Sequence, residues 1–224
     1  MGISEINYDI QFEPLFSNFT FKGMEILSFK TTPSNKFVLN CAEIKIQKCY
    51  ILSKNKTIDV DFKLDAKKEL LSLVSKSKVS GKIKLCIEYT GILNDRLLGF
   101  YRSKYTDPSG KTKYLATTQF EAADARRAFP CWDEPATKAT FDVSLLVEKN
   151  YMAISNMPIR KKQSFGSKII YEFERTPIMS TYLLYLGVGE FEYVETKLRN
   201  IQIRVLTTKG NKNKAKLSLE LTKK

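Results

Sequence analysis

Two polar side chains two residues apart, Gln119 and Glu121, offer the clearest chemistry in this chain. A carboxylate supplies the negative charge that an ammonium group needs, and a carboxamide oxygen beside it accepts a further hydrogen bond. If residues 114–120 form a strand, both side chains project from one face at its C-terminal end. The pair therefore indicates a site for a charged amino group. A glutamate at a strand end can equally begin a helix, where the helix dipole favours negative charge.

Charged residues of both signs crowd the segment that follows, namely Asp124, Arg126, Arg127, Asp133 and Glu134. Arginine binds a carboxylate through two parallel hydrogen bonds, so such pairs can hold a loop with few apolar residues in one shape. We interpret these five residues as a structural ion-pair network. A phosphate-binding role would require a glycine-rich loop, which this segment lacks. Trp132, the only tryptophan, is expected to pack the loop onto a sheet.

The chain contains no histidine. Serine and cysteine nucleophiles usually need a histidine base, and the His-Glu-x-x-His zinc motif needs two. We therefore expect no catalytic residue, no bound metal and no cofactor within this chain. No C-x-x-C pair occurs, and we expect buried, reduced thiols rather than zinc ligands or disulfides. The four cysteines are Cys41, Cys49, Cys86 and Cys131.

Composition narrows the classes of partner. The net charge is +13, but lysine dominates and alternates with apolar residues, as in residues 82–85, which is typical of a solvated sheet face. A nucleic-acid site usually gathers arginine and aromatic residues in one patch, so we expect no nucleic-acid partner. No apolar run is long enough to span a bilayer, and the first residues do not form a secretion signal. We expect no membrane partner and a cytoplasmic location.

Alternation of apolar and polar residues predicts an all-β fold. Residues 8–12, 37–41, 83–89 and 141–147 show it clearly, and each run ends near a turn signal. Many short strands at this spacing predict a sandwich of antiparallel sheets. Helix is expected in only three short segments, which are residues 65–74, 121–128 and 213–221.

The last of these segments determines the predicted domain organisation. Leu217 and Leu221 lie four residues apart, and Asn213 could cap the helix at its N-terminus. A helix this short is marginal without a packing partner. We therefore expect residues 1–208 to form the β-sandwich and residues 209–224 to be a linker and the first helix of a catalytic domain. The alternative is a frayed basic tail on a complete domain.

Several motifs, in their order and spacing, resemble the amino-terminal domain of the aminopeptidase N family of zinc metallopeptidases, which includes the leukotriene hydrolases. The resemblance covers most of the chain and is strongest after Gly99. One departure is Ala122-Ala123, where the family usually has proline and a small polar residue. The motifs are Gly99–Ser103, Thr118–Glu121, Asp124–Pro135, Phe141–Val143, Ala153–Pro158, Met179–Leu183 and Gly187–Phe191.

The resemblance implies a saddle-like β-sandwich that packs on a thermolysin-like catalytic domain of the same polypeptide. It also implies that Gln119 and Glu121 line the first substrate pocket, with Glu121 bound to the α-ammonium of a peptide N-terminus. In the family the zinc ion belongs to the catalytic domain, and the motifs of that domain do not occur here. The implied function is removal of single residues from peptide N-termini, with this chain inactive alone.

Two other functions remain open at this point. A subunit of a general transcription factor resembles the family without peptidase activity, so the chain could be a non-enzymatic binding or scaffold module. Retention of both Gln119 and Glu121 favours the peptidase. A free-standing sandwich that binds carbohydrate or protein would show exposed aromatic rows, whereas the tyrosines here mostly fall in alternating, half-buried strands.

Overall fold

A computed structural model describes residues 2–53 and 56–223 of the chain. The predicted all-β sandwich is confirmed, and its largest sheet has eight strands in the order β10-β11-β8-β1-β2-β5-β3-β4. Neighbouring strands of this sheet are antiparallel, apart from the parallel pair β1 and β8. Its strands are β1 (Ile3–Leu15), β2 (Thr20–Asn40), β3 (Lys45–Ser53), β4 (Lys56–Asp65), β5 (Leu70–Ile92), β8 (Thr140–Glu148), β10 (Ile159–Phe165) and β11 (Lys168–Phe173).

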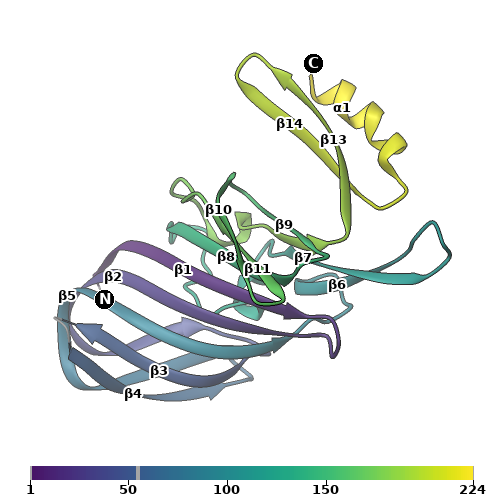
Figure 1. The fold of residues 1–224 in the computed structure, drawn as a ribbon. Coiled ribbons are helices and arrows are strands. Elements are labelled where there is room, and N and C mark those ends of the chain that lie inside the picture. The colour runs from purple at the N-terminus through teal and green to yellow at the C-terminus, as the bar shows by residue number, and fades with distance from the viewer. Residues whose placement is uncertain (1, 54–55, 224) are drawn as a thin grey trace.

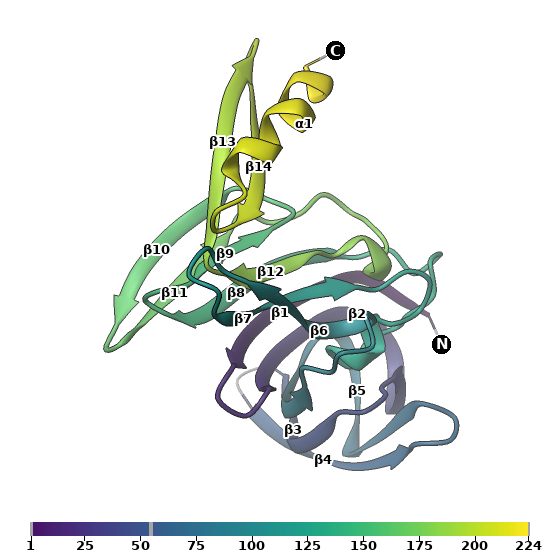
Figure 2. The ribbon, with the colours of Figure 1, turned by 90° about the vertical axis from the view of Figure 1, so that its right-hand side faces the viewer.

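The second sheet has four strands in the order β6-β7-β12-β9. The large sheet curls strongly, and the small sheet lies against it between β1 and the C-terminal hairpin (Figures 1 and 2). Two 3₁₀ turns, η1 (Ala125–Arg127) and η2 (Thr181–Leu183), lie in loops between strands. Among the described residues, no helix has the length and apolar character that crossing a membrane would require. The small sheet comprises β6 (Gly99–Thr106), β7 (Thr112–Gln119), β9 (Met152–Ser155) and β12 (Leu186–Gly189).

An aromatic layer fills the space between the two sheets. Phe12 of β1 packs edge-on against Phe100 of β6, with ring centroids 5.6 Å apart. Tyr8 stacks on Phe141 at 5.2 Å. All four side chains are completely buried, so the layer excludes water from the junction of the sheets. Burial of each such side chain stabilises the fold by about 1.5–3 kcal/mol. The four cysteines are free and buried, as predicted.

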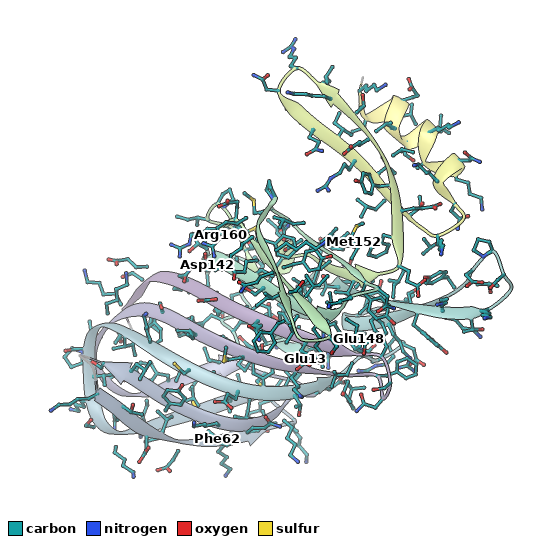
Figure 3. All side chains as sticks on the ribbon, in the orientation of Figure 1. Glu13, Phe62, Asp142, Glu148, Met152 and Arg160 are labelled. Carbon is teal, nitrogen blue, oxygen red and sulfur yellow. The ribbon has the colours of Figure 1, made fainter. Side chains whose placement is uncertain are left out.

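The large sheet also carries side chains outside the hydrophobic core, among them Phe62, Glu13 and Asp142. Figure 3 shows Phe62 on the outer strand β4, far from Met152 of β9, which lies on the side of the hairpin. Glu13 of β1 accepts a hydrogen bond from Lys168 of β11 (Figure 3). On the outer face, Asp142 forms an ion pair with Arg175, and their nearest atoms are 2.7 Å apart. Polar contacts of this kind join segments of the chain that are distant in the sequence.

The C-terminal hairpin of β13 (Phe191–Leu198) and β14 (Ile201–Thr208) forms a separate two-stranded sheet. The helix α1 (Ala215–Thr222) follows a 3₁₀ turn, η3 (Lys212–Lys214), and packs on this hairpin, and the unit projects from the sandwich (Figure 1). The predicted third helix is therefore present. The boundary between residues 208 and 209 as the start of a further domain stays a prediction.

One detail predicted for this helix, its N-cap, is wrong. The N-cap is Lys214, and neither it nor Asn211 before η3 caps with its side chain, because the 3₁₀ turn runs directly into the helix and leaves Asn213 inside that turn. The face that packs on the hairpin carries Ala215 and Leu219. Leu217 and Leu221 are 68% and 59% exposed, which agrees with the expectation that they have no packing partner within the chain.

Two of the three predicted helices are absent. Residues 65–74 instead form the end of β4, a turn at residues 66–69 and the start of β5. The turn is stabilised by the Asp65 carboxylate, which accepts hydrogen bonds from the backbone N–H groups of Lys67 and Lys68, both at 3.1 Å. Leu71 and Leu73 are buried around an exposed Ser72, which is the alternation of a strand. The segment 121–128 contains only the single turn η1, since Pro130 follows too closely for a longer helix.

The sequence pattern did not predict that one ionisable side chain, that of Glu25, is buried in the core. Glu25 of β2 is completely buried, and neither of its carboxylate oxygens has a hydrogen-bond partner among the described residues. The Tyr89 hydroxyl, also buried, lacks a partner in the same part of the chain. Burial raises the pKa of Glu25 well above its usual value of 4.5. The folded protein therefore keeps this side chain as a neutral acid to higher pH than an exposed glutamate.

We expect this group to make the stability of the domain depend on pH. An acid whose pKa is raised on folding contributes stability that is fully present below pH 4.5 and is lost as pH rises towards the pKa of the folded state. Within that window the free energy of unfolding should fall by about 1.4 kcal/mol per pH unit on account of Glu25. Urea denaturation at a series of pH values measures it, with Glu25→Gln and Glu25→Leu losing this part of the slope. Parallel curves for the wild type and both variants would contradict the expectation.

Candidate functional site

Gln119 and Glu121 lie at the C-terminal end of β7, at the rim of the four-stranded sheet. Burial alternates through this stretch: Thr118 and Phe120 are buried, whereas Gln119 and Glu121 are exposed. β7 ends at Gln119 and Glu121 follows in the turn, so both side chains are open to solvent where the strand ends. Neither side chain has a hydrogen-bond or ion-pair partner among the described residues. Both are available to a group from outside this chain.

The exposed residues are anchored by their buried neighbour. Phe120 is 2% exposed and packs edge-on against Phe129, with ring centroids 6.1 Å apart. Beyond it the chain turns, because the backbone N–H of Asp124 donates to the carbonyl of Phe120 at 2.9 Å. The turn takes in Glu121, Ala122 and Ala123, and the peptide bond between Glu121 and Ala122 is cis. Glu121 thus sits at the start of a closed turn rather than on a free end.

Asp133 is the most buried member of the predicted ion-pair network. It is 2% exposed. Its carboxylate accepts hydrogen bonds from Arg126 Nε at 3.0 Å, from the Arg126 backbone at 3.2 Å and from Thr181 Oγ1 at 2.8 Å. Its own backbone N–H donates to Asn40 at 3.0 Å. A buried carboxylate satisfied in this way ties the loop to β2 and to η2.

The two arginines share one carboxylate partner, Glu69. Arg127 contacts three carboxylates: Asp124 at 2.8 Å, Glu43 at 2.8 Å and Glu69 at 2.9 Å. Arg126 contacts Asp133 at 3.0 Å and Glu69 at 3.2 Å. These are charge-assisted pairs of the kind that orders loops.

The ion pairs also change the titration of the arginines. Burial by itself would lower the pKa of Arg126, but hydrogen bonds to Asp133 and Glu69 outweigh it, and the pKa is raised. The same balance raises the pKa of Arg127, where Asp124 is the principal hydrogen-bond partner. Both guanidinium groups therefore stay charged at every pH at which the fold is stable.

Four of the five residues predicted for this network belong to it, and two further members were not predicted. The structure brings together Asp124, Arg126, Arg127 and Asp133. Glu134 is exposed, and the ion pairs among residues 2–53 and 56–223 do not include it, whereas its neighbour Asp133 is buried and binds Arg126. Glu43 and Glu69 complete the network from the large sheet, and no local pattern marks them, since they precede the arginines by more than 50 residues.

The loop is also joined to the large sheet through its backbone. Asn40 and Cys131 form an antiparallel bridge, with N···O distances of 2.7 and 3.0 Å. The indole of Trp132 donates to the Val38 carbonyl at 2.9 Å and packs edge-on on Phe29. The expectation that Trp132 packs the loop onto a sheet is confirmed. The site is therefore built on the junction of both sheets.

An apolar surface adjoins the site. Tyr185 lies beside β7, where its hydroxyl is 3.2 Å from Thr117 Oγ1, two residues before Gln119. Leu183 in η2 and Ile178 are large apolar side chains that face solvent, and Ile178 is 73% exposed.

Among residues 2–53 and 56–223, no group of three or more cysteine, aspartate or glutamate side chains is arranged to hold a metal ion.

Comparison with known proteins places this geometry in a family. Residues 4–183 match the model of the peptidase M1 N-terminal domain. The chain belongs to this family. The site described above lies within the matched residues, as do all of the resembling motifs except Gly187–Phe191.

Full-length relatives of this M1 N-terminal domain are aminopeptidases. The chain is 40% identical to aminopeptidase 2 of Candida albicans over 98% of its own length and 24% of the relative. It is 41% identical to the alanine/arginine aminopeptidase of Saccharomyces cerevisiae, over 94% of the chain and 25% of the relative. The puromycin-sensitive aminopeptidase of Caenorhabditis elegans is 33% identical over 97% of the chain and 24% of the relative. The chain thus spans about a quarter of the length of these relatives and corresponds to one domain of a larger polypeptide.

Proposed function

We propose that this chain is the substrate-amine-binding wall of a zinc aminopeptidase that removes single residues from peptide N-termini. Glu121 binds the α-ammonium of the peptide, and the Gln119 carboxamide oxygen accepts one of its hydrogen bonds. The observation that carries this proposal is the pair of exposed polar side chains without intramolecular partners, held on a loop that the ion-pair network fixes. Asp124 and Asp133, which hold the loop, are by contrast paired with arginines.

The remainder of the polypeptide supplies the other walls of the site. Gln119 and Glu121 are open to solvent in this chain, so nothing here separates a bound peptide from water. The exposed apolar side chains of Ile178, Leu183 and Tyr185 lie in the segment that contacts β7, and this surface is of the kind that a packing domain covers. We place the catalytic domain of the same polypeptide against it.

The chemistry of hydrolysis belongs to that domain. The described residues of this chain do not fit a zinc site, so no catalytic step is assigned to them. In the proposed full-length enzyme a zinc ion would be held by residues outside this chain and would supply an activated water for hydrolysis. The role of this chain is to orient the N-terminus of the peptide, which fixes the position of the bond to be cut.

A cytoplasmic location is consistent with four buried, unpaired cysteines.

An activity assay with two proteins tests this proposal. The full-length polypeptide should hydrolyse chromogenic aminoacyl amides, whereas residues 1–224 alone should neither hydrolyse them nor retain stoichiometric zinc after dialysis. A full-length protein that folds but lacks turnover would favour the non-enzymatic scaffold instead. Turnover by residues 1–224 alone would show that the division of labour between the two parts is wrong.

A further inference from the structure

Glu69 is the only carboxylate among the described residues that binds both arginines of the site loop. One oxygen lies 2.9 Å from a terminal nitrogen of Arg127, and the other lies 3.2 Å from a terminal nitrogen of Arg126. Glu69 belongs to the turn between β4 and β5 of the large sheet. Its side chain therefore spans from the large sheet to the loop that begins at Glu121.

The backbone holds this glutamate in an uncommon conformation. Glu69 has a φ of 54° and Glu43, the other large-sheet partner of Arg127, has a φ of 59°. Left-handed conformations are uncommon for residues other than glycine and cost of order 1 kcal/mol each, so they persist where surrounding contacts require them. In addition, the Glu69 carbonyl accepts a hydrogen bond from the backbone of Cys41 at 2.9 Å. The carboxylate thus projects from a fixed point.

Arg127 connects this fixed point to the substrate-binding residues by two routes. Its Cβ lies so close to Gly99 that a Cβ on that glycine would be 2.8 Å away, and Gly99 is paired with Gln119 across β6 and β7. Its backbone N–H donates to the Asp124 carbonyl at 3.1 Å, and Asp124 in turn closes the turn that contains Glu121. Displacement of Arg127 would therefore move both Gln119 and Glu121, the two residues proposed to bind the amine.

We infer that Glu69 is a positioning residue for substrate binding, which acts through Arg126 and Arg127 to fix Glu121 and Gln119 in the geometry that receives a peptide's amino group. This inference rests on the proposed function of Glu121. It goes beyond it by assigning a role to a residue of the large sheet that has no contact with the substrate. Glu43 acts in the same way through Arg127 alone.

The test uses the full-length polypeptide and a Glu69→Gln variant, which keeps the size of the side chain. We expect kcat/KM for aminoacyl amides to fall about five- to thirtyfold, because misplacement of a binding group by about 1 Å costs up to about a hundredfold. The loss should appear in KM, since the ammonium is bound in the ground state and the transition state alike. Glu43→Gln should show a smaller loss. Asp61→Asn is the matched control. It removes one negative charge, as Glu69→Gln does, but from an exposed residue of β4 that is not part of the ion-pair network.

A double-mutant cycle with Glu121→Ala separates positioning from stability. If Glu69 acts through Glu121, Glu69→Gln should lower kcat/KM in the wild-type background and have little further effect once Glu121 is alanine. An equal loss in both backgrounds, or no loss in the wild type while Glu121→Ala remains impaired, would overturn the positioning role. If Glu121→Ala itself leaves kcat/KM unchanged, the amine-binding function fails, and that result is distinct from a failure of Glu69. Should Glu69→Gln not fold, the same cycle with Glu43→Gln gives the answer.

Discussion

Glu121→Ala in the full-length polypeptide is expected to lower kcat/KM for peptides with a free N-terminus by about 30-fold to several-thousand-fold. Loss of one half of a desolvated charge pair typically costs about 2–5 kcal/mol, and each 1.4 kcal/mol is about tenfold. The variant should stay folded, because the Glu121 side chain is exposed and makes no contact that the fold depends on. Steady-state kinetics together with a thermal unfolding curve measures both effects.

Graded variants make this result specific to the ammonium group. Glu121→Gln should be intermediate, since it keeps an acceptor oxygen and loses the charge. Gln119→Ala should cost less, because a neutral hydrogen bond contributes less than a charged one. Glu134→Ala is the matched control, since Glu134 is an exposed glutamate of the same segment. Competitive inhibition by an amino-acid amide and by its N-acetyl form would complete the comparison, and an equal effect of Glu121→Ala on the two inhibitors would contradict the role in amine binding.

Asp133→Ala should produce the largest loss of stability in this region. It would leave Arg126 without its most buried partner and Thr181 Oγ1 without its acceptor. Removal of one partner of a buried pair typically costs about 3–5 kcal/mol. For a domain of this size each kcal/mol lowers Tm by about 2–4 °C, so a fall of about 6–20 °C is expected. Urea and thermal denaturation of residues 1–224 measure it.

Conservative changes at the same position should locate the source of that loss. Asp133→Asn keeps a hydrogen-bond acceptor for Thr181 Oγ1 and loses the charge that faces Arg126, so its effect should be smaller than that of alanine. The adjacent Glu134→Ala should lie within about 0.5 kcal/mol of the wild type, as is usual for exposed substitutions. If Asp133→Ala and Glu134→Ala were equally stable, the ion-pair network would not hold the loop, and its structural interpretation would be wrong.

Local pattern in the sequence was sufficient for the class of the fold. The alternation in residues 8–12 and 141–147 is that of half-buried strands, and those residues lie in β1 and β8. Alternation reports burial on one face of a strand, so it predicts that a strand exists but not which strand lies beside it. The parallel pairing of β1 with β8 joins segments separated by more than 130 residues, and no local signal encodes it.

Helix prediction failed where short polar and apolar runs were ambiguous. Residues 65–74 contain good helix formers, yet the Asp65 turn and the burial of Leu71 and Leu73 decide for a hairpin. Intrinsic propensity differs by only a few tenths of a kcal/mol per residue, whereas each buried leucine contributes about 1.5–3 kcal/mol. Tertiary packing therefore outweighs the local preference. The third predicted helix is present as α1, where Ala215 and Leu219 are buried and Leu217 and Leu221 are exposed.

By itself the sequence determined the types of group available to the site: a carboxylate and a carboxamide two residues apart, two arginines, and no histidine. The spacing of Gln119 and Glu121 predicted a shared face at the end of a strand. In the structure both side chains are exposed, with Gln119 as the last residue of β7 and Glu121 in the turn that follows. Only the tertiary structure decided which carboxylates hold the arginines. Asp133 and Glu134 are equivalent in the sequence, but one is buried beside Arg126 and the other faces water. Glu43 and Glu69 are distant in the sequence, and they reach Arg127 because curling of the large sheet brings its turns to the loop.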